Sequence, residues 1–231
     1  YAQAMNLSIA DNLAHVQAHI EAACQAAGRP VGSVRLLAVS KTWGPEAVRA
    51  AHVAGQTAFG ENYIQEAVDK ILALQDLPLE WHCIGPIQSN KTRLVAEHFD
   101  WVHSVDRLKI AQRLSEQRPA HLPPLQVCIQ VNVDGGETKS GVAPQDLPAL
   151  AQAVAALPRL QLRGLMTIPE PAETDELMRA VHAQAKALFD SLRAQGLPLD
   201  TLSMGMSADL AAAIAEGSTM VRVGTAIFGK R

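Results

Sequence analysis

The chain has 231 residues, of which 48% are apolar and 19% are charged, and its formal net charge at neutral pH is −3. This composition fits one large globular domain over residues 1–231, or two small ones, and the weak charge offers no general attraction to nucleic acid. No apolar run approaches the ~18 residues that a membrane span needs, and the three cysteines lack the spacing of a disulfide framework or a zinc site, so we expect a cytoplasmic protein without membrane or nucleic-acid partners.

The first predicted element is a helix over residues 6–27. Its apolar positions share one helical face: Leu13, Val16, Ile20 and Ala23. Gly28 ends the pattern, as is typical of a helix C-terminus. Residues 1–4 precede Met5, and we expect them to be a non-native lead.

Eight short apolar runs follow, separated by amphipathic helical patterns. They are residues 35–39, 57–60, 81–84, 101–104, 125–131, 160–166, 201–204 and 220–223. Several are apolar on both faces, which is typical of parallel strands covered by helices. This alternation predicts a closed (β/α)₈ barrel with an extra helix in front, because closure removes exposed sheet edges. The alternative is an open, doubly wound sheet.

The loops after the strands hold the candidate chemistry, because the active face of such a barrel lies at the carboxyl ends of its strands. Lys41 follows the first strand. The turns after the seventh and eighth strands carry small and hydroxyl residues that are typical of a phosphate site: Gly205, Ser207, Gly224 and Thr225. Alternatively these are turn residues, with Ser207 as the N-cap of the next helix.

Lys41 suggests a covalent role. A lysine desolvated at a barrel mouth becomes a nucleophile that forms a Schiff base with a carbonyl group. With a phosphate site across the same mouth, the ligand would be a phosphorylated aldehyde, and pyridoxal phosphate has both groups. The alternative is a lysine that extends into solvent from the end of its strand.

Three polar side chains within the predicted strands are candidates for a role in a site. The charge of Arg222 needs a partner, either a ring nitrogen of a ligand or an acid such as Glu61 or Asp106. His82 and His103 have no third ligand at metal-binding spacing. We therefore expect them to be hydrogen-bonded core residues, and we predict no metal site.

Seven segments together resemble the YggS/PROSC family of pyridoxal phosphate homeostasis proteins. They extend over about residues 7–229 and read LLAVSKTW, AFGENYIQEAVDK, WHCIGPIQSNKTR, VHSVDRLKIAQRL, VNVDGGETKSGV, LRGLMTIP and LSMGMSADLAAAIAEGSTMVRVGTAIFG. The resemblance implies an alanine racemase-like barrel, the type III fold of pyridoxal phosphate proteins.

The resemblance also implies roles for single residues. Lys41 would form an aldimine with pyridoxal phosphate, Asn62 would lie against the cofactor, and Arg222 would face the pyridine nitrogen and keep it unprotonated. Lys139 would assist cofactor exchange, although by itself it also fits a solvated loop lysine. Four residues would surround the phosphate: Ser203, Ser207, Gly224 and Thr225.

A non-catalytic carrier is favoured over an enzyme. Racemases with this barrel use a second domain and a second acid or base, whereas this chain ends six residues after Thr225 and has only Tyr1 and Tyr63 as tyrosines. We expect a monomer that holds pyridoxal phosphate and passes it to apo-enzymes by transimination at Lys41. The alternatives are a single-domain amino-acid racemase and a Schiff-base aldolase that acts on a sugar phosphate.

Overall fold

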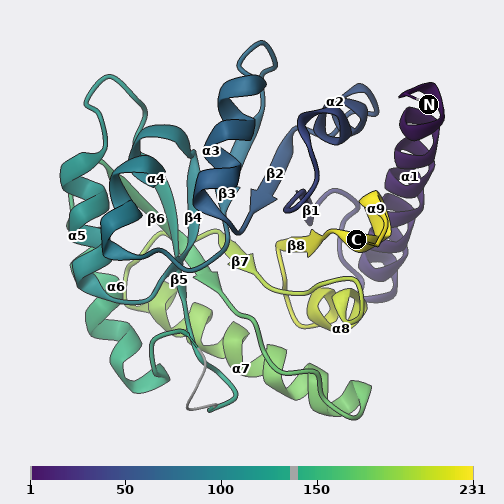
Figure 1. Cartoon of the computed structure of the whole chain (residues 1–231). Helices are drawn as coiled ribbons and strands as arrows, with labels where there is room; N and C mark the ends of the chain where they lie inside the picture. Colours follow the sequence, from purple (N-terminus) through teal and green to yellow (C-terminus); the bar gives the residue numbers. More distant parts are fainter. Residues whose placement is uncertain (1, 136–139, 231) are drawn as a thin grey trace.

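The computed structural model of the chain describes residues 2–135 and 140–230. Eight parallel strands pair in chain order, and β8 pairs with β1 to close a barrel (Figure 1). The predicted barrel is therefore confirmed, and the open sheet is wrong. The strands are β1 (Arg35–Val39), β2 (Ala58–Glu61), β3 (Glu80–Cys83), β4 (Trp101–Val105), β5 (Leu125–Gln130), β6 (Leu160–Met166), β7 (Thr201–Ser203) and β8 (Met220–Val223).

Helices alternate with the strands and cover the outside of the barrel (Figure 1). Within the described ranges, no helix combines the length and the apolar character that a transmembrane span requires. The helices are α1 (Ala2–Ala26), α2 (Pro45–Val53), α3 (Ile64–Ala73), α4 (Thr92–His98), α5 (Leu108–Gln117), α6 (Leu147–Ala155), α7 (Asp175–Ala194), α8 (Leu210–Ala215) and α9 (Thr225–Phe228), with short 3-10 helices at η1 (Ser89–Lys91) and η2 (Pro144–Asp146).

Helix α1 packs against α2, α8 and α9 and so joins the first and last elements of the chain (Figure 1). It begins at Ala2, before the predicted start at residue 6. Asn12 Nδ2 donates a hydrogen bond to the Ile227 carbonyl oxygen at 2.8 Å. Burying one large aliphatic side chain contributes about 1.5–3 kcal/mol, and one stripe of α1 buries four: Ile9, Leu13, Val16 and Ile20.

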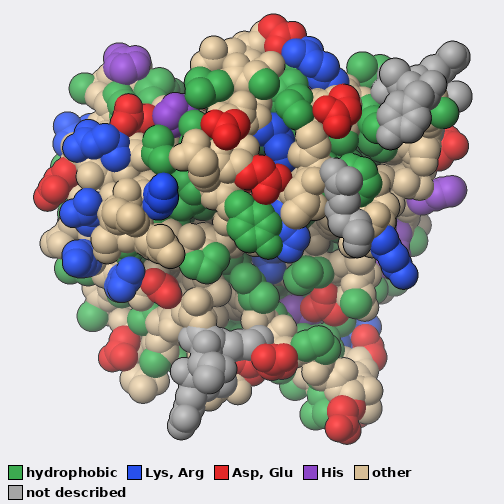
Figure 2. All heavy atoms as spheres, in the orientation of Figure 1, with side chains coloured by type: hydrophobic (Ala, Val, Ile, Leu, Met, Phe, Trp, Pro, Cys, Tyr) green, Lys and Arg blue, Asp and Glu red, His purple; other side chains and the backbone are tan. Residues whose placement is uncertain are grey.

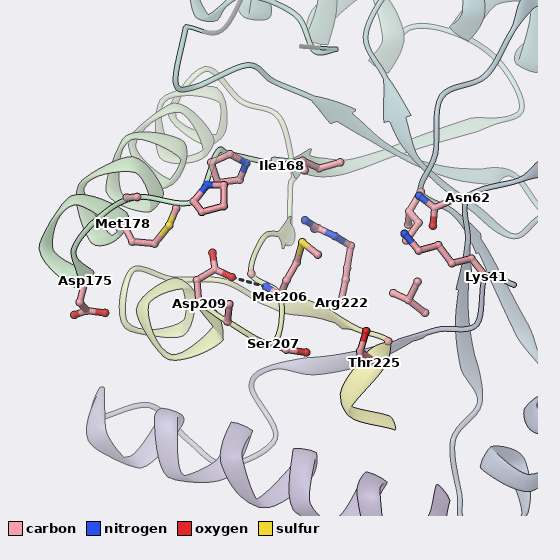
Figure 3. A pocket seen from close by; sticks show the side chains of 18 of the residues that line it. Lys41, Asn62, Ile168, Asp175, Met178, Met206, Ser207, Asp209, Arg222 and Thr225 are labelled. Carbon is pink, nitrogen blue, oxygen red and sulfur yellow. Dashed lines mark hydrogen bonds between the residues drawn. The ribbon is translucent and has the colours of Figure 1, made fainter. Parts of the chain in front are cut away.

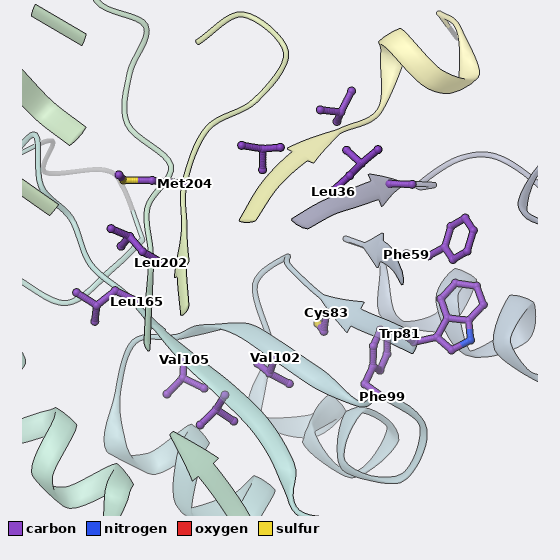
Figure 4. Packing of buried hydrophobic residues seen from close by; sticks show 14 of the residues in the cluster. Leu36, Phe59, Trp81, Cys83, Phe99, Val102, Val105, Leu165, Leu202 and Met204 are labelled. Atoms are coloured by element: carbon purple, nitrogen blue, oxygen red, sulfur yellow. The ribbon is translucent and has the colours of Figure 1, made fainter. Parts of the chain in front are cut away.

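The strand residues divide between two apolar layers. The outer layer packs between the sheet and the helices (Figure 4) and includes Leu36, Phe59, Trp81, Val102, Leu165 and Leu202. The inner layer consists of two separate clusters, one of Leu37, Ala58, Ile84 and Met220 and one of Trp101, Cys128 and Met166. Because alternate residues of a strand point to opposite faces, Leu36 points outward and Leu37 inward. Lys41, four residues after Leu37, lies on the inward side.

The surface carries both signs of charge. On the face shown in Figure 2, basic and acidic side chains are interspersed, which agrees with the net charge of −3. A surface of this kind produces no strong field of a single sign on that face.

Candidate functional site

A cavity of about 910 Å³ opens at the carboxyl ends of the strands (Figure 3). Its walls are the ends of β1, β2 and β8 and the loops that follow β6, β7 and β8. This volume is typical of small-molecule sites, which span roughly 300–1,000 Å³. Six of the predicted site residues line it together: Lys41, Asn62, Ser207, Arg222, Gly224 and Thr225.

Lys41 lies two residues beyond β1 and extends its amine into the cavity beside Asn62 (Figure 3). Its side chain is exposed, so the desolvation expected from the sequence is not seen, because the cavity is open to solvent. Of the described lining residues, Lys41 alone carries an amine. It is therefore the group in this cavity that can attack a carbonyl carbon.

The backbone on both sides of Lys41 is held by charged side chains. The Ser40 carbonyl oxygen accepts a hydrogen bond from Lys70 Nζ at 2.9 Å. The Thr42 amide donates to Glu66 Oε1 at 2.7 Å, and Thr42 has a φ of +67°. A left-handed conformation costs a β-branched residue on the order of 1–3 kcal/mol unless its surroundings hold it. These contacts therefore fix the point from which the Lys41 side chain extends.

Glu61 and Lys70 form a buried ion pair beneath this segment. Lys70 Nζ lies 2.9 Å from Glu61 Oε2, and the two side chains are 3% and 0% exposed. The Ser40 hydroxyl donates to the same carboxylate oxygen. Burial raises the pKa of Glu61, against the opposing effects of Lys70 and Ser40. Glu61 is therefore bound to Lys70 and is not the ion-pair partner that the sequence suggested for Arg222.

Asn62 follows β2 and lies beside Lys41 (Figure 3). Its Oδ1 is buried and has no hydrogen-bond partner among the described residues, while the residue as a whole is part-exposed and lines the cavity. A Cβ at Gly85 would lie only 2.4 Å from the Asn62 carbonyl oxygen. The absence of a side chain at Gly85 therefore allows Asn62 its place at the cavity.

A second wall is made by the turns after β7 and β8. Ser207 and Thr225 are exposed and lie at the cavity (Figure 3). Amides in the first turns of α8 and α9 lack intrahelical partners, so this wall offers donors to an anionic group. The predicted N-cap role of Ser207 is wrong, because α8 begins at Leu210 and Asp209 holds the N-cap position.

Arg222 lies between these two walls and is only 4% exposed. Its Nη1 donates to Ser203 Oγ and its Nη2 to the Thr167 carbonyl oxygen, each at 2.7 Å. Burial lowers the pKa of the guanidinium to about 10, so the group stays charged at neutral pH. Asp106, the second acid considered as its partner, accepts instead from the Gly141 amide at 3.2 Å.

Ser203 was expected at the phosphate, but it does not line the cavity. It is 0% exposed, and its hydroxyl contacts Arg222 and, at 2.9 Å, His103 Nδ1. Ser203 is the last residue of β7, and its contacts with Arg222 and His103 place its hydroxyl inside the barrel. Its place is beneath Arg222, as a support for that side chain.

Three other residues considered from the sequence, Tyr63, His82 and His103, do not line the cavity. Tyr63 is 54% exposed before α3, and Lys139 lies outside the described residues. His82 and His103 are buried and hydrogen-bonded to each other at 2.8 Å, as expected of core histidines. The described ranges contain no cluster of three or more side chains suited to a metal ion.

The cavity extends further, along the loops after β6 and β7. Asp209 Oδ1 accepts from the Met206 amide and Oδ2 from His182 Nε2, each at 2.8 Å. Burial by itself would raise the pKa of Asp209, but these hydrogen bonds outweigh it and lower the value. The residues that line this part were not identified from the sequence, and they include Ile168, Glu173, Met206 and Asp209 in the segments after β6 and β7 and Asp175 and Met178 in the first turn of α7.

The lining of the cavity thus includes an amine, an amide, a guanidinium and, on the wall formed by the turns after β7 and β8, the hydroxyl groups of Ser207 and Thr225, while carboxylates lie in the part along the loops after β6 and β7. The amine can bond covalently to a carbonyl carbon, and the guanidinium can donate to a ring nitrogen. The hydroxyl groups and helix-start amides suit a phosphate. A compact ligand with an aldehyde, an acceptor nitrogen and a phosphate at separate positions fits these groups.

Comparisons with known proteins give one consistent answer. The chain matches the family model described as the N-terminal domain of alanine racemase over residues 12–231. It is 64% identical over 224 residues to the pyridoxal phosphate homeostasis protein of Pseudomonas aeruginosa, a match covering 97% of this chain and 96% of that protein. The protein of the same name from Escherichia coli K12 is 56% identical over 226 residues, with coverages of 96% and 97%.

Solved structures have the same barrel. PipY of Synechococcus elongatus, solved with pyridoxal phosphate bound, has a TM-score of 0.84 and 41% identity, over 96% of this chain and 100% of PipY. Alanine racemase of Corynebacterium glutamicum has a TM-score of 0.70 at 21% identity, over 98% of this chain and 61% of the racemase. The second likeness concerns the fold alone.

Proposed function

The chain belongs to the pyridoxal phosphate homeostasis proteins, within the alanine racemase N-terminal domain family, and from this membership we propose that it binds pyridoxal phosphate in the cavity as a non-catalytic carrier. The observation that carries the proposal is the placement of Lys41, Arg222 and the hydroxyl wall around one cavity. Pyridoxal phosphate presents an aldehyde, a ring nitrogen and a phosphate to these three groups. The names of the relatives refer to homeostasis and not to a reaction, which supports the carrier over the racemase.

Lys41 holds the cofactor covalently in this proposal. Its neutral amine attacks the aldehyde carbon, a C=N bond forms, and the carbonyl oxygen leaves as water, which yields a Schiff base. Water would hydrolyse the C=N bond and return the free aldehyde and the Lys41 amine, whereas an incoming amine would displace the Lys41 amine and take the cofactor as its own Schiff base. The exposed position of Lys41 supports release, since an amine reaches it directly from solvent.

The remaining lining residues orient the cofactor. Arg222 donates N–H groups and accepts none, so it pairs with a ring nitrogen that keeps its lone pair. An unprotonated ring is a weaker electron sink, which suits holding more than turnover. Asn62 lies against the ring, and Ser207, Gly224 and Thr225 bind the phosphate through hydroxyl and amide donors.

Apo-enzymes that use pyridoxal phosphate are the recipients that we propose. Several expectations from the sequence stay predictions beside this one: a single domain over residues 1–231, a monomer, a cytoplasmic location and an exchange-assisting role for Lys139. Light scattering tests whether the protein is a monomer. The rate at which pyridoxal phosphate passes to an apo-enzyme, compared between wild type and a Lys139→Ala variant, tests the role of Lys139.

Absorption spectroscopy of Lys41→Ala tests the covalent link. Wild type loaded with pyridoxal phosphate should show the visible band of a Schiff base, and borohydride should fix the cofactor on the peptide that contains Lys41. Lys41→Ala should lose both signals, while Lys109→Ala, at an exposed lysine on α5, should keep them. An undiminished band in Lys41→Ala would contradict the proposed link.

Chiral chromatography tests the carrier against the racemase. Prolonged incubation of the loaded protein with single enantiomers of many amino acids should produce no opposite enantiomer. If the wild-type protein racemises an amino acid and the Lys41→Ala variant does not, the protein is an enzyme and the carrier proposal is wrong.

A further inference from the structure

A line of hydrogen bonds, buried except at Glu80, runs from Arg222 through the barrel interior to its opposite end. Arg222 Nη1 lies 2.7 Å from Ser203 Oγ, and Ser203 Oγ lies 2.9 Å from His103 Nδ1. His103 Nε2 lies 2.8 Å from His82 Nδ1, and His82 Nε2 lies 2.7 Å from Glu80 Oε1. We call these five residues the relay. Its members come from β8, β7, β4 and β3.

The chemistry of the two ends determines where every proton of the relay lies. An ionised Glu80 can only accept, so His82 donates through Nε2. A neutral His82 then accepts at Nδ1, so His103 donates through Nε2. A neutral His103 accepts at Nδ1 from the Ser203 hydroxyl, which leaves the Ser203 oxygen to accept from Arg222. All four hydrogen bonds point from the cation at the cavity to the anion at the far end.

The surroundings keep both histidines neutral. His82, His103 and Ser203 are 0% exposed, and burial lowers the pKa of both histidines. The charged groups that face them are Arg222 at one end and, at the other, Glu80 with Arg35, whose Nη2 lies 3.0 Å from Glu80 Oε1. The ring of Trp101 stacks on His82 with centroids 5.1 Å apart. A second cation between the two arginines would be costly.

We propose that Ser203, His103 and His82 are positioning residues that orient Arg222 toward the ring nitrogen of the bound cofactor. Without an acceptor at His103, the Ser203 hydroxyl is free to turn its proton toward Arg222 and oppose the donor there. With the relay intact, the guanidinium is held by Ser203 and by the Thr167 carbonyl oxygen at the wall of the cavity that Arg222 lines. This inference rests on the proposed function, because it concerns the ring nitrogen of pyridoxal phosphate.

Nitrogen-15 NMR of the histidines in protein without added cofactor tests the relay itself. His82 and His103 should both appear as neutral rings with the proton on Nε2, unchanged between about pH 6 and pH 8. A proton on Nδ1 of either ring, or titration in that range, would overturn the relay whether or not the protein binds pyridoxal phosphate.

Variants of Ser203 test its effect on Arg222. Ser203→Ala should weaken pyridoxal phosphate binding by roughly tenfold or more, the cost of one hydrogen bond to a charged group, and should change the pH dependence of the visible band. Ser203→Thr keeps a hydroxyl and should restore both readouts. Ser115→Ala, the matched control, removes another buried hydroxyl, which donates to the Pro158 carbonyl oxygen, and should change neither.

His103 provides a second, independent pair of variants. His103→Leu removes the acceptor for Ser203 and should reproduce the effect of Ser203→Ala, whereas His103→Asn places an acceptor oxygen near the former Nδ1 and should recover part of the affinity. Folded variants that bind and absorb like wild type would overturn the positioning role alone. A wild-type protein that binds no pyridoxal phosphate would overturn the proposed function and, with it, the ligand of Arg222.

Discussion

Two lysines near the end of β1 have opposite environments. Lys41 is exposed and lies in the cavity, whereas Lys70 is buried and holds both the Ser40 carbonyl oxygen and Glu61. A buried ion pair adds little net stability, but breaking it leaves one charge unpaired in a poorly solvating interior. The role of Lys70 is therefore to hold the backbone next to Lys41 in place, through its hydrogen bond to the Ser40 carbonyl oxygen.

Replacing Lys70 with methionine should destabilise the protein by about 3–5 kcal/mol, because Glu61 would stay buried without its partner. Urea unfolding measures the change. The double variant Lys70→Met/Glu61→Gln should recover part of the loss, since it leaves no buried charge without a partner; Glu66, which Lys70 also contacts at 3.4 Å, is partly exposed. Arg49→Met, which removes an exposed ion pair with Asp76, should leave the midpoint nearly unchanged. Equal losses of stability in Lys70→Met and in the double variant would contradict the explanation that an unpaired buried charge causes the loss.

Some residues of the site could be identified from the sequence, and others could not. Lys41 and Arg222 could be found because a charge beside or within an apolar strand is conspicuous in the sequence. Ser203 was taken for a phosphate residue, since neither its inward direction nor its contact with Arg222 can be read from neighbouring residues. Asp209 was missed as a lining residue because an acid near a helix start is also an ordinary cap.

At the scale of elements, the turn from β7 into α8 shapes one wall of the cavity. Gly205 has a φ of +103°, and a Cβ there would lie 2.7 Å from Ala213 Cβ in α8. Glycine is favoured at this position for two reasons: the backbone is left-handed, and helix α8 approaches too closely for a side chain. The turn brings Ser207 and Asp209 to the cavity as a consequence.

Gly205→Ala should destabilise the protein by roughly 1–3 kcal/mol and weaken pyridoxal phosphate binding, because the clash with α8 moves the turn. Gly55→Ala is the matched control: φ is +102°, but no atom lies within 4 Å of the added Cβ. It should lower stability through backbone strain and leave binding unchanged. Thermal unfolding and cofactor titration of both variants separate the two effects, and equal binding losses would contradict the steric account.

At the scale of the whole molecule, the barrel interior encloses titratable groups that favour neutral to alkaline conditions. The pKa values of His82 and His103 are lowered from 6.5 by burial. The hydrogen bond from His82 outweighs burial and lowers the pKa of Glu80 from 4.5 to about 2. In each case the unfolded chain takes up a proton at a higher pH than the folded one, so acid favours unfolding.

Stability should therefore fall as the pH drops below 6.5, through the two histidines, and fall again between pH 4.5 and about 2 through Glu80. Urea midpoints at about pH 7.5 and about pH 5.5 measure the first step. His103→Asn should reduce the difference between these midpoints. His19→Asn, at an exposed histidine of α1, should preserve it. A wild-type midpoint independent of pH in this range would contradict the prediction.

The sequence by itself determined the order of strands and helices, the closed barrel and the strand-end position of Lys41. Each follows from the spacing of apolar residues over a few positions, and eight strand patterns with crossovers favour closure. Only the tertiary structure decided which side chains meet. Ser203 contacts His103 across 100 positions of the chain, and Lys70 contacts Ser40 across 30. Such contacts depend on the register and inward direction of strands that lie far apart in sequence, which local spacing does not encode.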